Sequence, residues 1–590
     1  MASSEAKNSP EDLESVRPTA IPYWRLVIDQ SGVTPEVLRY DYRGSGTEKE
    51  PYIVQWIPED PRNPLLFSAP KRWFITMSVA IATLAVALTS SAYTGGIAEI
   101  IQEFHLSREV STLGVSLYVV GFAIGPLLWA PLSEVFGRQI LFIVTYACLT
   151  IFNVACAAAP NGTSLLVFRF LAGAFGSSPL TNAGGAIADM FPASQRGLAM
   201  AIFAAAPFLG PVLGPICGGF IGMNASWRWV MGFLAIFSGV IWIAGSLAIP
   251  ETYAPTLLRR RAAKLSTITG KVYISAIDAK QGQVSLKASI KTALLRPWIL
   301  LFREPIVFLL SIYMSIIYGT LYLFFAAFPI VYQQSRGWNQ GVSGLAFLGI
   351  MFGMLGAIAY IIPDNKRYIR TEQRHDGFAP PEARLPPAIL GSLAIPIGLF
   401  WFAWTNYPSI HWVVSIIAGV PFGFGMVLVF LSIMNYLIDS YTIFAASVLA
   451  ASSILRSLFG AAFPLFTVQM YGNLGLHWAS SVPAFLALAC VPFPFLFYKY
   501  GPQIRAHCKF AAESDAFMCS LKQSHAQEMQ IEKLEEPAQQ ANDNEDDSTV
   551  VDEPIFTPTR ARTSSVHERA SLYDGNPYDT DRVHTRNSFS

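Results

Sequence analysis

The amino-acid sequence predicts an all-α polytopic membrane protein, built from two bundles of six helices each with both termini in the cytoplasm. Only 14% of the 590 residues are charged and 52% are hydrophobic, whereas soluble domains carry about 25% charged residues. The polar residues gather at the two ends of the chain and in one central segment. Between them lie about twelve apolar stretches, each near the roughly 20 residues that a helix needs to cross a bilayer.

The apolar stretches form two sets of six. Because the bilayer core offers the backbone no hydrogen-bond partners, each stretch is expected to be a helix. The first set covers 73–93, 112–131, 140–159, 165–190, 199–221 and 228–249; the second covers 306–333, 342–362, 386–404, 411–436, 443–469 and 478–499.

This pattern divides the chain into five segments. From about Glu513 the sequence is too polar to bury a core, so the tail is expected to be largely disordered. Residues 286–303 are expected to form an amphipathic helix on the membrane surface. The segments are an N-terminal arm (1–72), a first bundle (73–249), a central loop (250–305), a second bundle (306–500) and the tail (501–590).

The positions of Lys and Arg set the orientation, because cytoplasmic loops are enriched in both residues. The central loop carries the run Arg259–Arg261 among many other cations, and the loop after the eighth stretch adds residues 366, 367 and 370. The loops on the opposite side hold only Arg108, Arg228 and Arg336. The arm, the central loop and the tail are therefore all expected in the cytoplasm.

Several function classes lack support in the sequence. The net charge of +1 offers no basic surface for nucleic acid. The six Cys are scattered without metal-binding spacing. No phosphate-binding G-x-x-x-x-G-K-[ST] motif and no G-x-S-x-G nucleophile motif is present. We therefore expect no metal, no cofactor and no enzyme activity.

Glycines recur every fourth residue in the fifth stretch, interrupted by prolines. Such a stripe lets two helix backbones pack closely in a membrane. Gly222, near the outer loop, is expected to lie outside the stripe. The run resembles the antiporter motif of drug-efflux proteins of the major facilitator superfamily, and its residues are Gly210, Pro211, Gly214, Pro215, Gly218 and Gly219.

The loop after the second stretch is similar to the loop between the second and third helices of that superfamily. It runs from Gly125 to Arg138, with Glu134 as its acid and Gly137 as its turn residue. Its Pro-Leu-Ser-Glu form looks like the fungal branch of twelve-helix drug:proton antiporters. That branch also has an arm ending in W-x-x-x-D-P-x-N-P, which residues 56–64 match.

Arg169, in the fourth stretch, looks like the Arg of the family's R-x-x-x-G motif, which implies a role in proton coupling. The alternative is that its side chain reaches the outer membrane surface. Asp189 ends the same stretch on the inner side, near Arg196 of the next loop. These two residues, with Glu134 and Arg138, are expected to form an inner gate of ion pairs that breaks when the protein opens inward. The alternative is ordinary helix capping and the general excess of positive charge on the inner side.

Arg456 stands near the middle of the eleventh stretch, and Asp439 is a possible partner for it. Its role as a substrate ligand and its role as a structural clamp are both open. Tyr318, Tyr322 and Phe325 share one face of the seventh stretch. They would either line a substrate cavity with Arg456 or fill space between helices.

The resemblance implies a monomeric transporter in the fungal plasma membrane. It would export drugs, toxins or secondary metabolites by alternating access, driven by protons, and its substrate is expected to be an amphipathic or cationic small molecule. Two alternatives remain open. One is an importer or uniporter of a nutrient such as a polyamine, sugar or carboxylate, and the other is a membrane sensor that transports nothing.

Overall fold

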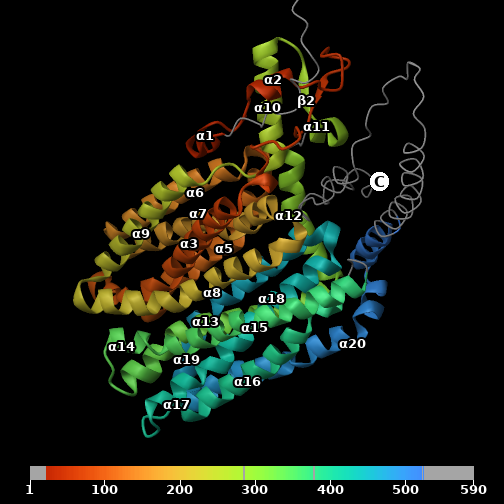
Figure 1. Ribbon diagram of the computed structural model, residues 1–590. Helices are drawn as coiled ribbons and strands as arrows, with labels where there is room; N and C mark the ends of the chain where they lie inside the picture. Colours follow the sequence, from red (N-terminus) through yellow and green to blue (C-terminus); the bar gives the residue numbers. More distant parts are fainter. Residues whose placement is uncertain (1–20, 283–285, 376–378, 521–522, 524–590) are drawn as a thin grey trace, which may run out of the picture.

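The structure is a computed structural model that describes residues 21–520, except 283–285 and 376–378, together with residue 523. Most of the predicted tail therefore lies outside the described residues. Long helices form two adjacent bundles, one above the other in Figure 1, with the first half of the chain in one and the second half in the other.

The first half contains six long helices. They are α3 (Ala69–Ala92), continued by η3 (Tyr93–Gly96) and α4 (Ile97–Phe104), then α5 (Arg108–Phe136), α6 (Arg138–Ala157), α7 (Gly162–Met190), α8 (Ala193–Asn224) and α9 (Trp227–Ala248).

The second half repeats this plan. It contains α13 (Pro305–Phe328), η4 (Pro329–Gln334), α14 (Gln340–Gly344), α15 (Phe347–Arg374), η5 (Pro381–Arg384), α16 (Pro386–Thr405), α17 (Trp412–Ile417), α18 (Gly419–Ser440), η6 (Thr442–Phe444), α19 (Ala445–Cys490) and α20 (Pro492–His507). A further helical segment covers 509–520, so regular structure continues past the boundary predicted at residue 500.

Each of the twelve predicted apolar stretches lies almost wholly in helix. By length and composition, ten helical segments of the described chain could cross a membrane. One of them, Thr442–His507, contains two predicted stretches. Gly475, with a φ of +73°, separates these two stretches by interrupting the helix. The remaining stretch is α7, which carries buried polar residues such as Arg169 and Asn182. The all-α polytopic fold is therefore confirmed.

Apolar side chains on the outside of the bundles match a lipid environment. On α9, for example, Trp229, Ile236, Val240 and Leu247 are 60–73% exposed. In a water-soluble protein such a row would be covered, whereas in a membrane it contacts acyl chains.

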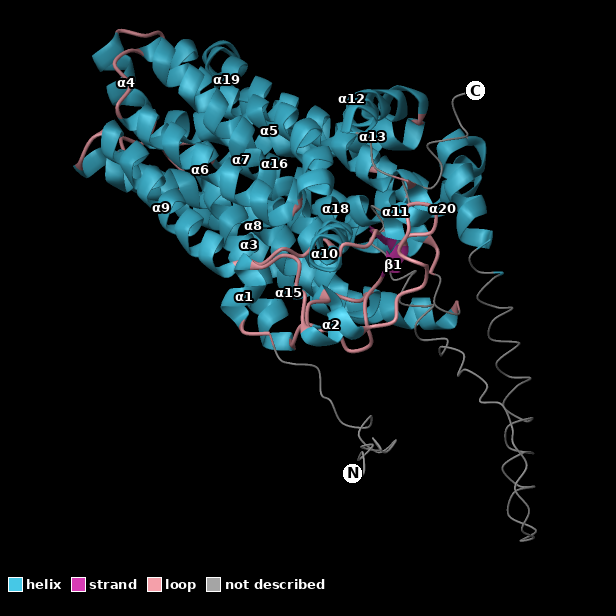
Figure 2. Ribbon diagram, turned by 90° about the horizontal axis from the view of Figure 1, so that it is seen from above, coloured by secondary structure: helices cyan, strands magenta, loops and turns pink. Residues whose placement is uncertain are grey.

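The N-terminal arm and the central loop fold together at one end of the bundles. The arm contributes α1 (Tyr23–Ile28), α2 (Pro35–Arg39), β1 (Tyr52–Val54) and η2 (Pro64–Leu66). The central loop contributes α10 (Ala254–Thr269), β2 (Tyr273–Ser275), α11 (Ala276–Gln281) and α12 (Leu286–Arg303). We call residues 21–66 and 254–281 the inner platform, since this is the end predicted to face the cytoplasm (Figures 1 and 2).

A small parallel sheet and a hydrophobic core hold the inner platform together. Tyr52 pairs with Tyr273 and Val54 with Ser275 across β1 and β2. Val37 and Val54 of the arm are buried with Leu265 and its neighbours on α10. The sequence did not predict this sheet, because two three-residue strands are too short to show a period of two.

The helix expected over 286–303 is present as α12. Leu300 and Leu301 are buried, and α12 packs against α5, α13 and α19, so it touches both bundles. Leu295, Trp298 and Phe302 remain 40–73% exposed. That this face lies on the membrane surface stays a prediction.

Candidate functional site

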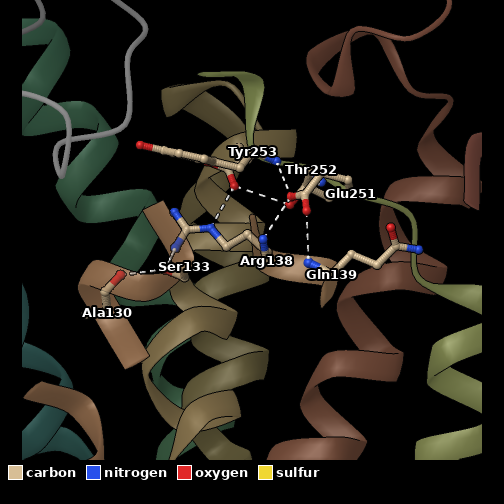
Figure 3. Close-up of polar contacts among 8 residues, drawn as sticks. Ala130, Ser133, Arg138, Gln139, Glu251, Thr252 and Tyr253 are labelled. Carbon is tan, nitrogen blue, oxygen red and sulfur yellow. Dashed lines mark hydrogen bonds and ion pairs between the residues drawn. The ribbon is translucent and has the colours of Figure 1, made fainter. Parts of the chain in front are cut away.

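The inner end of the first bundle is organised around the turn between α5 and α6. Gly137 ends α5 with a φ of +97°, a conformation that favours glycine. A side chain at this position would also run into the carboxylate of Glu251. That carboxylate accepts hydrogen bonds from the backbone N–H groups of Arg138 and Gln139, at 3.0 and 3.1 Å (Figure 3).

The Arg138 side chain joins α6 to α7. Its Nε donates to Asp189 Oδ2 at 3.1 Å, and its Nη1 donates to Ser133 Oγ at 3.1 Å. The guanidinium also lies 4.9 Å from the centre of the Tyr253 ring. Both charged side chains are nearly covered, with exposures of 11% and 5%. The structure thus brings together two of the four residues proposed for the inner gate.

Of the other two predicted gate residues, only Glu134 has a described side chain. Glu134 lies on the last turn of α5, close enough for its charge to act on Arg138. Arg196 belongs to α8, and its side chain lies outside the described residues.

Glu251 is the functional candidate that the sequence analysis missed. It is fully buried, and besides the two N–H groups after Gly137 it accepts from the backbone N–H groups of Thr252 and Tyr253. Glu251 thereby ties the end of α9 to the start of α6. An acid one residue after Pro250, at the end of the sixth apolar stretch, was the available signal.

The D-P-x-N-P motif of the arm connects this loop to the inner platform. Arg62 is fully buried and donates to the backbone oxygen of Glu251 at 3.2 Å. Burial lowers the pKa of the Arg62 guanidinium to about 10. Asp60 accepts two hydrogen bonds from Arg261 of α10, at 2.5 and 3.2 Å, and Trp56 stacks on the same guanidinium at 5.0 Å. The motif therefore has a clear structural role.

Arg169 lies inside the first bundle, so its side chain does not reach the outer surface and the snorkelling alternative is wrong. It is fully buried and donates to three backbone oxygens: Gly114 at 3.0 Å, Thr89 at 3.0 Å and Ser90 at 3.2 Å. The rings of Tyr93 and Tyr118 lie 4.9 and 4.4 Å from its guanidinium carbon. Arg169 of α7 thus holds α3 and α5 together.

A short chain of polar contacts continues from Arg169 into the second bundle. The Ser90 hydroxyl lies 2.8 Å from the Tyr322 hydroxyl on α13, and the Tyr318 hydroxyl donates to the Tyr322 hydroxyl at 3.3 Å. The guanidinium of Arg456 lies 5.2 Å from the Tyr318 ring. Four of the predicted residues are therefore linked across the interface between the bundles.

One expectation about this cluster needs correction, and one alternative can be narrowed. Asp439 is not the partner of Arg456, because it forms an ion pair with Arg384 at 2.9 Å near the inner end. Phe325 packs on Phe347 of the same bundle at 5.4 Å and is only 4% exposed. It therefore fills space in this conformation, which is one of the two alternatives for this residue.

The glycine stripe of α8 packs against α3. A Cβ atom at Gly210 would lie 2.5 Å from Ala87 Cβ, and one at Gly214 would lie 2.7 Å from the backbone nitrogen of Ala92. Gly222 would place a Cβ 2.9 Å from the backbone carbon of Gly95, so it belongs to the same stripe. The expectation that Gly222 lies outside the stripe is wrong, since it is simply the next residue at the four-residue spacing.

An adjacent face of α8 contacts the second bundle at the outer end. A Cβ at Gly219 would lie 2.9 Å from the backbone oxygen of Gln340, and the Gln340 side chain donates to the backbone oxygen of Gly95. A Cβ at Gly344 would lie 2.6 Å from the backbone oxygen of Pro215. The helix that carries the antiporter motif is therefore packed between α3 and the second bundle.

These features define a class of protein: two helical bundles with polar contacts at their interface and a charged loop at the inner end are the arrangement of a secondary transporter. The family model described as Major Facilitator Superfamily matches residues 79–464. The chain belongs to this superfamily. It is a multi-pass membrane protein that transports a small molecule, and it is not an enzyme.

The similar proteins include several fungal transporters. The "Major facilitator superfamily multidrug transporter mdrA" of Aspergillus fumigatus is 64% identical over the whole of both chains. The "MFS-type efflux pump MFS2" of Trichophyton rubrum is 64% identical over 98% of this chain and 97% of its own. The "Efflux pump FUBT" of Fusarium oxysporum is 56% identical over 85% of this chain and 84% of its own.

Solved structures agree with the fold. The proton:xylose symporter XylE matches with a TM-score of 0.53 and 17% identity, over 74% of this chain and 96% of its own.

Proposed function

We propose that this chain is a proton-coupled efflux transporter of the plasma membrane, which works as a monomer and exports drugs, toxins or secondary metabolites. Two of its relatives are named efflux pumps, which supports export. The observation that carries the proposal is the position of Arg169. Its buried, permanently charged side chain holds two helices of the first bundle together. Only Ser90 separates it from Tyr322 of the second bundle.

The geometry suggests how a charge in the first bundle could affect the interface. Arg169 binds the backbone oxygens of Thr89 and Ser90, and the Ser90 side chain contacts Tyr322. A change in the hydration or charge around Arg169 would shift this part of α3 and disturb the contact. Inward movement of one proton supplies about 1.4 kcal/mol per pH unit and about 2.3 kcal/mol per 100 mV.

The ion pair predicted as an inner gate would instead act as a clamp at the other end of the same bundle. The Arg138–Asp189 pair fixes α6 to α7, and Glu251 fixes the end of α9 to the same turn. These bonds all lie within the first bundle, so they would keep its inner end rigid while the bundles rock against each other.

The proposal is tested by following efflux from cells. Yeast cells that express the full chain and lack their own drug pumps are loaded with rhodamine 6G or with carboxyfluorescein, and the loss of each dye is followed. We expect export of at least one dye against its gradient, with loss of export after an uncoupler is added. Export that continues after the proton gradient has collapsed would contradict proton coupling. Uptake in place of export would favour the importer.

A sensor would show neither export nor uptake. In that case, removal of residues 521–590 would change signalling, whereas the transporter should keep its efflux without this segment.

A further inference from the structure

The interior of the two bundles contains cations without matching carboxylates. Arg169 and Arg456 lie well inside spanning helices. Among the described residues, the acids of the spanning helices stand near the ends of the apolar stretches. They are Glu99, Glu103 and Glu109 at the outer end and Glu134, Asp189, Glu304, Asp364, Glu372 and Asp439 at the inner end. The middle of the protein is therefore positively charged in the part of the chain that the structure describes.

The two arginines differ in how well they are satisfied. Arg169 is fully buried and binds three backbone oxygens. Arg456 keeps part of its surface accessible, although it lies near the middle of a spanning helix. Its one hydrogen bond in the described structure runs from Nη2 to Ser453 Oγ at 3.3 Å, and its Nε is buried without a partner. Arg456 therefore has donors left for a ligand.

The surroundings of Arg456 place it at the interface between the bundles. Gly460 lies one helical turn further along α19, on the same face. A Cβ at Gly460 would lie 2.9 Å from the Tyr318 ring and 3.3 Å from Val119 of the first bundle. Because α19 runs outward from the inner end, Arg456 lies on the inner side of this contact, the side from which a cytoplasmic substrate would arrive.

Aromatic rings flank the guanidinium. The centres of the Tyr318 and Phe430 rings lie 5.2 and 5.6 Å from its carbon atom. Phe430 in turn packs on Phe208 of the first bundle at 4.9 Å. The site thus combines an apolar aromatic wall with one unpaired cation. Inside a membrane, such a cation strongly favours an anion and disfavours a second cation.

We propose that Arg456 binds the acidic group of an anionic amphipathic substrate, whose apolar body packs against Tyr318 and Phe430 once the bundles part, since both rings are covered in this conformation. This inference rests on the proposed export function and reverses the charge expected for the substrate from the aromatic residues alone. An anion also suits export, because the inside-negative membrane potential drives negative charge outward.

The test compares three probes that share one ring system: 2-naphthoate, 2-naphthamide and 2-naphthylmethylammonium. Their binding to the full-length purified protein is measured by equilibrium dialysis. The protein is held in lipid nanodiscs of neutral phosphatidylcholine, so that charged lipid does not itself attract or repel the probes. We expect 2-naphthoate to bind about 10-fold or more tightly than the ammonium probe, since hydrogen bonds to charged groups are of this size. Arg456→Gln should remove the preference and leave 2-naphthamide binding unchanged. The matched control is Lys291→Gln, which neutralises an exposed cation on α12.

Equal binding of the charged probes, or no binding of 2-naphthoate, would overturn the inference. The comparison on the wild-type protein needs no variant, so a misfolded Arg456→Gln protein does not decide the result. Export of 2-naphthoate from energised cells is measured separately. Selective binding without export would refute the proposed function and leave the anion site, whereas export without charge preference would refute the anion site alone.

Discussion

Alanine at Gly214 and alanine at Gly218 should damage transport unequally, because different atoms face the two glycines. A Cβ at Gly214 would meet the hydroxyl of Ser91 first, which can rotate away, and only then backbone atoms, the nearest being the nitrogen of Ala92 at 2.7 Å. A Cβ at Gly218 would meet the backbone oxygen of Ala92, with the carbonyl carbon 2.9 Å away. A backbone group cannot rotate away, so α3 and α8 would have to separate.

The size of the effect follows from these contacts. Overpacking of this kind costs about 1–3 kcal/mol, which shifts an equilibrium between two conformations about 5- to 150-fold. Gly218→Ala should lie toward the upper end of this range. Gly214→Ala should lie lower, although the displaced Ser91 would lose its 2.8 Å bond to the backbone oxygen of Pro211, worth about 0.5–1.5 kcal/mol. Gly214→Val adds two more carbon atoms and should be worse than Gly214→Ala.

The assay is the initial rate of dye efflux at equal amounts of protein on the cell surface. Ser91→Ala should partly restore Gly214→Ala and should not restore Gly218→Ala. Gly222 cannot serve as the control, because it belongs to the stripe. Gly232 on α9 is suitable, since a Cβ there would meet only Trp229, at 3.8 Å. If Gly218→Ala exports as fast as Gly232→Ala, the close contact between α3 and α8 does not control transport.

Variants at three further residues test other parts of the account. Arg169→Ala should abolish uphill efflux at normal surface expression. Arg169→Lys should retain part of the efflux, because Lys keeps the charge but loses the planar set of donors. Full efflux in Arg169→Ala would exclude a coupling role. Asp189→Asn removes the carboxylate charge that faces Arg138, at a cost of about 3–5 kcal/mol, so the melting temperature of the purified protein should fall; an unchanged melting temperature would show that the pair stabilises nothing. Asp60→Asn should make the inner platform more sensitive to trypsin by weakening the bond to Arg261, while efflux by the intact molecules continues; unchanged cleavage would contradict the structural role of the motif.

Features with a regular spacing were the ones that the sequence predicted well. Twelve apolar stretches of spanning length marked the helices, and a four-residue spacing marked the close contact of Gly210 and Gly214 with α3. Gly222 follows the same spacing, and its nearness to a loop was the wrong reason to exclude it. Packing depends on which face a residue occupies, and the loop position carries no information about that.

Contacts between distant segments could not be predicted, because they leave no local pattern. Arg62 binds the backbone oxygen of Glu251 across 189 residues of sequence, and Arg138 reaches the same residue across 113. Neither pairing is marked by a period or a spacing. Asp439 shows the opposite case, in which an attractive guess from charge alone failed because Arg384 lies nearer in space.

The charged residues inside the membrane show both what the sequence can predict and what it cannot. The sequence singled out Arg169 and Arg456, since charge is rare in spanning helices. It could not show that Arg169 is satisfied by backbone oxygens while Arg456 keeps a free donor. That difference depends on the neighbouring helices, and it separates a structural and coupling role from a ligand-binding one.

A cross-link at the outer end tests alternating access most directly. A Cβ at Gly341 would lie 2.7 Å from the Phe220 ring of the first bundle, so this pair joins the bundles. In a chain whose native cysteines are replaced, Phe220→Cys with Gly341→Cys should form a disulfide under oxidation and stop efflux, and a reductant should restore it. Each single variant should be insensitive to oxidation. Efflux at the full rate in the fully cross-linked protein would contradict the central claim that the bundles separate at this end during transport.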